Sequence, residues 1–178
     1  MERTFTEQEE RRREERAALE EAGIDPYPYE WNVTDHAGGI LEAFDDAKHQ
    51  PGDDGAIPEP FRVSIAGRLM SRRIMGKASF FHLQDATGQI QVYVRRDDLP
   101  EGFYNTVFKK LFDIGDIVGI EGFVFRTRMG EVSVHTERIE LLAKALRPLP
   151  VIKEQDGQVY NEVTDKEFRY RQIGRAHV

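Results

Sequence analysis

Cysteine is absent from this chain of 178 residues, and so is any apolar run long enough to cross a membrane. The first absence excludes disulfides, thiolate metal ligands and cysteine nucleophiles, and it is typical of a reducing compartment. The second excludes a membrane-spanning helix, and the highly charged N-terminus does not have the pattern of a signal peptide. These absences predict a cytoplasmic protein with no membrane partner.

The sequence also lacks the motifs that most often mark an active site. It has no glycine-rich phosphate loop, no His-x-x-x-His pair and no Ser/His/Asp order in a recognisable context. The five histidines are scattered along the chain. Such motifs hold phosphates, metals and nucleophiles in place. We therefore expect no catalytic residue, no metal site and no catalysis by this chain alone.

Charge is distributed unevenly along the chain. The formal net charge is -7, yet residues 61–145 carry thirteen Lys and Arg against ten Asp and Glu. That segment is therefore about +3 and the remainder about -10, a local basic excess within an acidic chain. Because the excess is modest, the positions of the arginines must decide whether a nucleic acid is the partner.

A charged helix is predicted at residues 6–22. The pair Thr6 and Glu9 has the spacing of a capping box, and Gly23 followed by Pro26 ends the helix. Its surface is almost entirely charged, so a solvated helix is the simpler interpretation. The alternative is a face that contacts a nucleic-acid backbone. The residues concerned are Arg11, Arg12, Arg13 and Arg16.

An acidic segment rich in glycine and proline follows at residues 35–60. We expect a short helix near residues 40–48 and a mobile loop at residues 50–59.

From Phe61 onward the pattern becomes that of strands, interrupted by one helix. Alternating apolar residues predict three strands, a helix within residues 97–113, and then two more strands. This order is typical of an OB-fold, which makes the fold class mainly β with α: a five-stranded barrel with a helix between strands three and four. The oligonucleotide site of such a barrel lies on strands two and three, between the loops that follow strands one and four. The predicted strands are residues 61–69, 79–85, 89–94, 116–126 and 132–142.

Phe80 is the residue that points most directly to a ligand. In residues 79–85, Phe81 and Leu83 share one face of the strand, so Phe80 falls on the opposite, polar face. An aromatic ring there can stack on a nucleotide base. A bulge that turns Phe80 into the core is the alternative. Because the topology independently places the binding site on this strand, we favour the stacking role.

Polar and basic residues surround the predicted position of Phe80. Gln91 on the next strand can donate and accept hydrogen bonds at a base edge. Glu131 could accept from a base N–H, although a solvated carboxylate is the simpler interpretation from the residues alone. His82 shares the face, and a surface histidine without a specific role is the simpler interpretation for it. The basic residues expected to contact the nucleic-acid backbone are Arg72, Arg73, Lys77, Arg126 and Arg128.

Several longer runs resemble the anticodon-binding region of class II lysyl-tRNA synthetases. They are AGRLMSRRIMGKASF at residues 66–80, RDDLPEG at 96–102 and KALRPLP at 144–150. The similarity extends back to GIDPYP at residues 23–28 and forward to FRYRQ at 168–172, so it covers nearly the whole chain.

The resemblance implies a role for each site residue. Phe80 would stack on an anticodon uridine, Gln91 and Glu131 would read anticodon bases, and Arg72 with Arg73 would hold the nearby backbone. For Glu131 the resemblance thus favours a functional role over the simpler one. It also implies an intact cytoplasmic, homodimeric lysine-tRNA ligase that activates lysine with ATP and Mg²⁺ and transfers it to tRNA(Lys).

The family's catalytic domain, with its class II motifs, has no counterpart in this sequence, so we interpret the chain as a fragment that is inactive alone and has no cofactor of its own. The expected divisions are a helix and acidic linker at 1–60, an OB-fold anticodon-binding domain at 61–146, a connector at 147–172 and a non-native tail at 173–178. Two alternatives remain. One is a stand-alone OB-fold protein that binds single-stranded nucleic acid or tRNA without catalysis. The other is the anticodon domain of an aspartyl- or asparaginyl-tRNA synthetase, against which the longer matching runs favour lysine.

Overall fold

The computed structural model describes residues 5–50, 57–149, 152–155 and 158–161. The chain divides into two compact units, Met1–Arg147 and Pro148–Val178. The predicted tail at residues 173–178, much of the connector at 147–172 and most of the loop at 50–59 lie outside the described residues.

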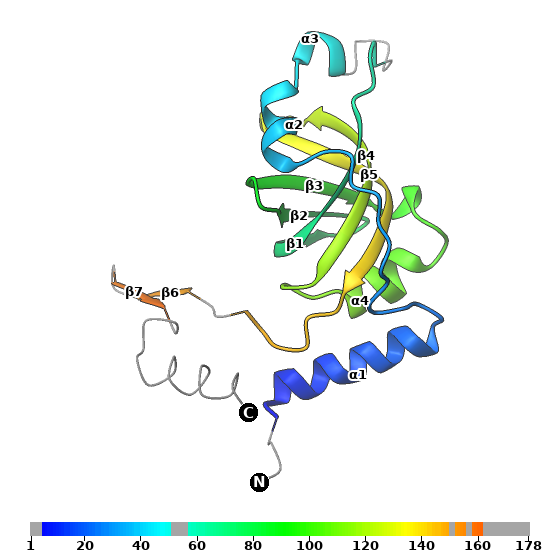
Figure 1. The fold of residues 1–178 in the computed structure, drawn as a ribbon, viewed down its shortest axis with the longest axis vertical. Helices are drawn as coiled ribbons and strands as arrows, with labels where there is room; N and C mark the ends of the chain where they lie inside the picture. Colours follow the sequence, from blue (N-terminus) through cyan, green and yellow to red (C-terminus); the bar gives the residue numbers. More distant parts are fainter. Residues whose placement is uncertain (1–4, 51–56, 150–151, 156–157, 162–178) are drawn as a thin grey trace. The chain divides into compact units, whose positions relative to one another are not determined.

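The first unit contains a closed five-stranded barrel, which confirms the predicted OB-fold (Figure 1). The strands are ordered β1-β2-β3-β5-β4, with β3 and β5 parallel and all other neighbours antiparallel. A short helical segment separates β3 from β4, as expected. The strands are β1 (Arg62–Met75), β2 (Ala78–Gln84), β3 (Gln89–Arg95), β4 (Ile117–Arg126) and β5 (Val132–Ala143). The helical segment comprises η1 (Arg96–Asp98), η2 (Tyr104–Phe108) and α4 (Lys109–Leu111).

Alternating side chains of the strands fill the barrel. Phe108 and Phe112 of the helical segment are also fully buried, and the Phe108 ring lies 6.1 Å from that of Phe81. Burying such rings and aliphatic chains stabilises the fold by about 1.5–3 kcal/mol per side chain. The buried apolar strand residues are Val63, Ile65, Leu69, Phe81, Leu83, Ile90, Val92, Val94, Val118, Ile120, Val124, Val134, Ile139 and Leu141.

A β-bulge in β1 changes which side chains of that strand face outward. Leu69 is paired with Leu83, but the next pair is Ser71 with His82, so one extra residue stands in β1. Such an insertion shifts the inside-outside alternation by one position. Beyond the bulge, Ser71 and Arg73 therefore face outward with the polar side of β2, while Arg72 is paired with buried Phe81.

The helix α1 (Glu7–Glu21) begins with the predicted capping box: the Thr6 hydroxyl accepts from the backbone N–H of Glu9, whose carboxylate accepts from that of Thr6. The single helix predicted at residues 40–48 is wrong, because two helices form there. They are α2 (Ala37–Ala43) and α3 (Asp46–His49). The break occurs because the Asp45 side chain accepts from the backbone N–H of Ala47 and thereby caps a new helix.

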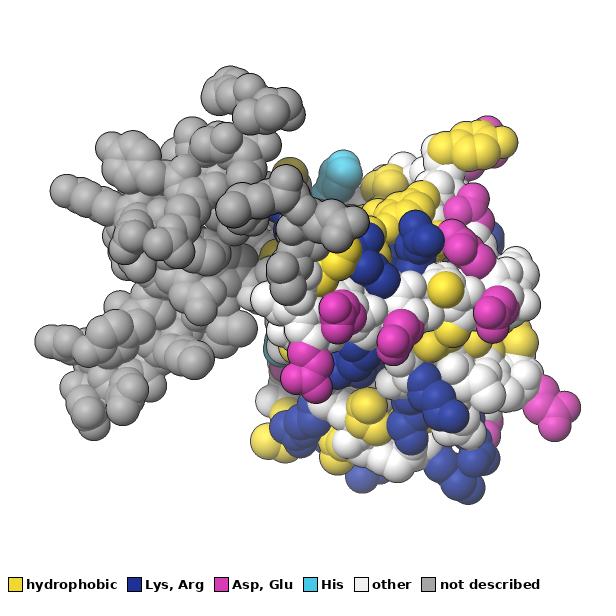
Figure 2. All heavy atoms as spheres, turned by 90° about the horizontal axis from the view of Figure 1, so that it is seen from below, with side chains coloured by type: hydrophobic (Ala, Val, Ile, Leu, Met, Phe, Trp, Pro, Cys, Tyr) yellow, Lys and Arg dark blue, Asp and Glu magenta, His cyan; other side chains and the backbone are white. Residues whose placement is uncertain are grey.

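The interpretation of α1 as a solvated helix is wrong for its inner face. Arg12 is 3% exposed and donates to the backbone carbonyls of Ala145, Arg147 and Ile114 at 2.9, 3.0 and 2.8 Å. These bonds hold α1 beneath the barrel (Figure 1). Arg12 is therefore a structural residue, and the predicted nucleic-acid contact is corrected for it. Seen from below, basic and acidic side chains are interspersed on this face (Figure 2).

The second unit contains a two-stranded antiparallel sheet of β6 (Ile152–Gln155) and β7 (Gln158–Asn161). Within the described part of the chain, no helix has the length and apolar character that a membrane span requires.

Candidate nucleic-acid interface

Phe80 lies half-buried on the outer face of β2, whereas its neighbour Phe81 is 1% exposed in the core. Its partner on β3 is Tyr93, and the two ring centroids are 4.9 Å apart. A ring supported on one side by another ring keeps its orientation while part of its surface remains open. The core alternative for Phe80 therefore does not describe this structure.

Gln91 and Glu131, which come from β3 and the turn before β5, are in direct contact. The Gln91 Nε2 donates to Glu131 Oε2 at 2.5 Å, and the Ser133 hydroxyl donates to Gln91 Oε1 at 2.9 Å. Residues Thr127 and Glu131 bond to each other through their backbones and the Thr127 hydroxyl, which fixes the turn. The structure thus brings together the two predicted base-reading side chains.

His82 belongs to the same cluster, although its pattern in the sequence gave it no specific role. Its Nε2 lies 3.2 Å from Glu131 Oε1, and its Nδ1 lies 2.8 Å from the hydroxyl of Ser71. The signal in the sequence was its outward register in β2, between Phe80 and Gln84. The identity of its partners depends on two other elements, β1 and the turn before β5, and could not be read from that register.

Three of the predicted basic residues are exposed. Arg73 is the cross-strand partner of Phe80, Lys77 lies in the turn between β1 and β2, and Arg128 lies in the turn between β4 and β5. Within the described ranges none of the three has an acidic partner. Their positive charges therefore remain available to an anion on this side of the barrel.

Arg72 is not brought to the surface with Arg73. Its Nη1 donates to the backbone carbonyls of Phe108 and Phe112 at 2.9 and 2.6 Å. Burial lowers the pKa of the Arg72 guanidinium from its usual value. The bulge in β1 explains the difference, because it turns Arg72 toward the helical segment that closes the barrel. The structure thus gives Arg72 an intramolecular role, which differs from the backbone contact that the sequence predicts.

Arg126 is also engaged within the chain. Its Nε and Nη2 contact the two carboxylate oxygens of Asp46 at 2.7 and 2.8 Å, and its Nη1 donates to the carbonyl of Gly130 at 2.8 Å. The hydrogen bonds to Asp46 raise the pKa of Arg126 and lower that of Asp46. Arg126 thus ties α3 to the turn between β4 and β5.

An aromatic cluster that sequence reasoning missed continues from Phe80 across the outer face. Tyr93 contacts His135 edge-on at 5.1 Å, and His135 stacks on Phe123 at 4.7 Å. The His135 Nε2 lies 2.7 Å from the Asp98 carboxylate, which orients the imidazole. These contacts join β3, β5, β4 and η1 beside the Phe80 ring.

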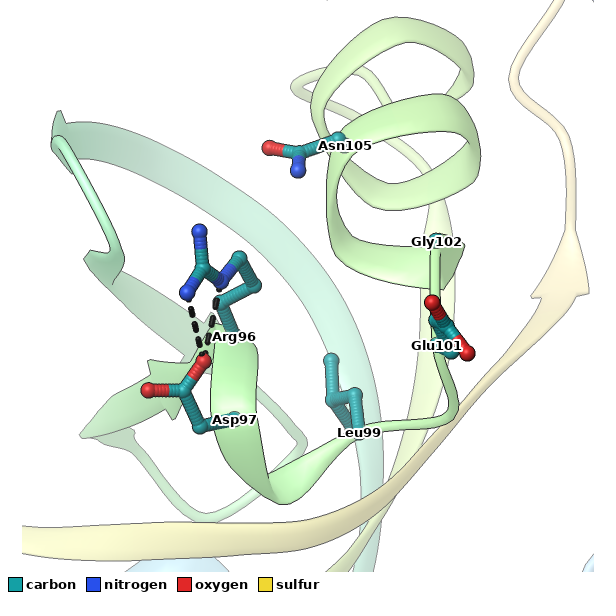
Figure 3. A pocket seen from close by; sticks show the side chains of 6 residues that line it. All are labelled: Arg96, Asp97, Leu99, Glu101, Gly102 and Asn105. Carbon is teal, nitrogen blue, oxygen red and sulfur yellow. Dashed lines mark hydrogen bonds and ion pairs between the residues drawn. The ribbon is translucent and has the colours of Figure 1, made fainter.

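A hollow of about 550 Å³ lies elsewhere, within the helical segment, between η1 and the start of η2 (Figure 3). Arg96 and Asp97 pair with each other at 2.9 Å on one wall, and Asn105 extends from the opposite wall. Its charged groups are thus partly neutralised by each other, and it shares no residue with the outer face of β2 and β3. We assign it no function.

Comparison with known proteins agrees with this geometry. Residues 63–142, which span nearly the whole barrel, match the family model of the OB-fold nucleic acid binding domain. The match and the strand order agree that the barrel is an OB-fold. The chain is also 52% identical over 173 residues to the lysine–tRNA ligases of two Porphyromonas gingivalis strains, ATCC 33277 and W83. It is 46% identical over 173 residues to that of Azobacteroides pseudotrichonymphae.

These relatives confirm the resemblance to lysine–tRNA ligases. Each alignment covers 94% of this chain, but only 28% of the Porphyromonas proteins and 33% of the Azobacteroides protein. The chain therefore spans about a third or less of the length of the curated relatives it matches.

Proposed function

We propose that this chain binds the anticodon loop of tRNA(Lys), as the tRNA-binding part of a lysine-tRNA ligase. The observation that carries the proposal is the arrangement on the outer face: Phe80 lies two positions along the strands from the Gln91–Glu131 pair, with Arg73 opposite the ring. A ring, a base-reading pair and a cation on one surface are what recognition of a single-stranded loop requires.

The stacking ring and the polar pair have different roles in binding. Stacking on Phe80 tolerates any base, because every base has a π-face. Selectivity then falls to Gln91 and Glu131. A carboxylate only accepts hydrogen bonds, so Glu131 favours a base that presents an N–H donor, as uridine does at N3. A uridine stacked on Phe80 would meet this requirement through its N3–H.

Arg73, Lys77 and Arg128 are the residues that we propose contact the backbone of the loop. All three are exposed: Arg73 lies opposite Phe80, Lys77 lies in the turn before β2, and Arg128 lies in the turn before β5. Arg72 and Arg126 support the interface instead, since their guanidinium groups are bonded to carbonyls and to Asp46.

The names of the relatives extend the proposal to the activity of the whole protein, the charging of tRNA with lysine. From the resemblance of the sequence we further propose that the whole protein is a cytoplasmic homodimer that uses ATP and Mg²⁺. In the part of the chain that the structure describes, no group of three His, Cys, Asp or Glu side chains could hold a metal ion. We derive no step of the ligase chemistry from the described residues.

Binding of anticodon stem-loops tests the proposal. A stem-loop with a UUU anticodon should bind more tightly than one with a scrambled loop, and Phe80→Ala should weaken binding by about 1–3 kcal/mol. Tyr29→Ala is the matched control, because it removes a 92% exposed ring that lies beside Glu121 and Arg138 of β4 and β5. Equal binding of both loops would indicate a non-selective single-strand binder and would overturn the proposal.

A further inference from the structure

His82 connects the two strands that flank it to the carboxylate of Glu131. Ser71 of β1 and Gln91 of β3 are its cross-strand neighbours, and all three side chains face outward. The bulge in β1 is what places Ser71 opposite His82, since an uninterrupted register would pair His82 with Met70. The local irregularity of β1 therefore creates a partner for one ring nitrogen of His82.

The partners of the two ring nitrogens determine how a neutral His82 carries its proton. A carboxylate can only accept, so the contact of 3.2 Å between His82 Nε2 and Glu131 Oε1 requires the proton on Nε2. Nδ1 is then an acceptor, and the Ser71 hydroxyl at 2.8 Å donates to it. The hydrogen bonds thus run in one direction, from Ser71 through His82 to Glu131.

A second chain of hydrogen bonds reaches Glu131 from the other side. Ser133 donates to Gln91 Oε1 and Gln91 Nε2 donates to Glu131 Oε2, which fixes the amide with its nitrogen toward the carboxylate. Each oxygen of Glu131 therefore has one internal donor, and each retains a lone pair for a ligand. The Glu131 side chain is 47% exposed, so without these two donors it would rotate in solvent.

We propose that His82 is a positioning residue: it holds the Glu131 carboxylate against the Gln91 amide, so that the pair presents one preset hydrogen-bonding edge to the base stacked on Phe80. This inference rests on the proposed function of the outer face. The gain comes from preorganisation, because a side chain that is already ordered loses less conformational freedom when the base binds. His82 itself needs no contact with the base.

Two variants at position 82 test the role of the donated hydrogen bond. H82A removes the donor, and H82Q retains an amide N–H with a similar reach. Each is titrated, beside the wild type, with stem-loops that carry UUU or UCU, and thermal unfolding checks the fold. The middle cytidine replaces the N3–H donor by an acceptor. We expect the preference for UUU to fall about tenfold in H82A and to stay within about threefold of wild type in H82Q.

The possible outcomes separate the two proposals. If the wild type binds UUU no better than a scrambled loop, the proposed function fails and the role of His82 fails with it. If the wild type is selective and H82A is equally selective, only the role of His82 is overturned. The same holds if H82Q loses as much selectivity as H82A, since the donor would then not be the cause.

A spectroscopic measurement tests the inference without RNA. In a protein with ¹⁵N-labelled histidine, long-range ¹H–¹⁵N spectra distinguish the two neutral tautomers of each ring. We expect neutral His82 to carry its proton on Nε2, and Glu131→Gln to change this signal more than the distant Glu137→Gln does. A His82 ring protonated on Nδ1, or one insensitive to Glu131→Gln, would overturn the proposal.

Discussion

The Glu131 carboxylate on the outer face of the barrel is 47% exposed, whereas the carboxylates of Asp113 and Asp116, between α1 and the barrel, are 12% and 0% exposed. The buried pair surrounds Lys144, whose Nζ lies 2.6 Å from Asp113 and 3.3 Å from Asp116, and 3.1 Å from Glu15 of α1. We call the buried group, Glu15, Asp113, Asp116 and Lys144, the seam cluster. Both regions are polar networks, but water reaches only one of them.

The two regions differ in how much hydrogen-bonding capacity is left over. In the seam cluster, Asp116 also accepts from the backbone N–H groups of Asp113 and Ala145, and Lys144 also donates to the carbonyl of Leu111. On the outer face, Glu131 and Gln91 retain open lone pairs and an N–H beside the half-buried ring of Phe80. A buried network whose groups are mostly paired within the chain stabilises one conformation, whereas an exposed network with open donors and acceptors can bind a ligand. Changes in the first should affect stability, and changes in the second should affect binding.

The largest expected effect tests the seam side of this comparison. Lys144→Met removes the buried cation that contacts all three carboxylates of the seam cluster, and it leaves Asp116, which is 0% exposed, without an ion-pair partner among the described residues. We expect a loss of about 3–5 kcal/mol in the free energy of unfolding, measured by urea denaturation. The exposed Lys110→Met is the control and should stay within about 0.5 kcal/mol of wild type. A similar loss of unfolding free energy in both variants would show that the seam cluster has no special role in stability.

Adjacent arginines sharpen the comparison within one strand. Arg72→Met leaves two carbonyls of the helical segment without their donor and should cost about 1–3 kcal/mol of stability, while selectivity for the UUU loop is kept. Arg73→Met removes an exposed charge beside Phe80, so it should weaken RNA binding and change stability by less than about 0.5 kcal/mol. Unfolding curves and stem-loop titrations on both variants check this. If Arg72→Met weakened RNA binding and Arg73→Met lowered stability, the conclusion that the bulge turns Arg72 inward would be contradicted.

The smallest effect is a pH dependence that arises from the seam cluster. Burial raises the pKa of Glu15 from 4.5 to about 7. Between about pH 4.5 and 7 the folded state therefore keeps a proton that the unfolded chain releases, so the free energy of unfolding falls as pH rises through this window. Glu15→Gln should flatten that part of the stability profile. An unchanged slope in the variant would show that another group causes it.

The fold was predictable because the information for it is local. Phe81 with Leu83, and Ile90 with Val92 and Val94, alternate within single strands, and the order of strands and helix follows from reading such runs in sequence. The outward register of Phe80 follows from the same alternation. Because an OB-fold binds oligonucleotides on its second and third strands, the predicted fold also predicted the face on which the site lies.

The rest depends on contacts between distant parts of the chain. Arg72 faces inward and Arg73 faces outward because of a single extra residue in β1, and the periodicity of the sequence does not predict that residue. Arg12 and Lys144 are buried only because α1 meets the segment after β5, more than a hundred residues away in sequence. The many charged residues of α1 favoured a solvated helix. Their partners lie far away in the sequence, so only the structure shows which charges are paired.

The central claim is that the outer face of β2 and β3 binds the loop, and a titration of the ¹⁵N-labelled chain with the UUU stem-loop tests it most directly. The account predicts backbone amide shifts concentrated at Phe80, His82, Gln91 and Glu131, with the seam-cluster amides of Asp116 and Lys144 unchanged. Shifts centred on α1 and the seam cluster, with the outer face unaffected, would contradict it.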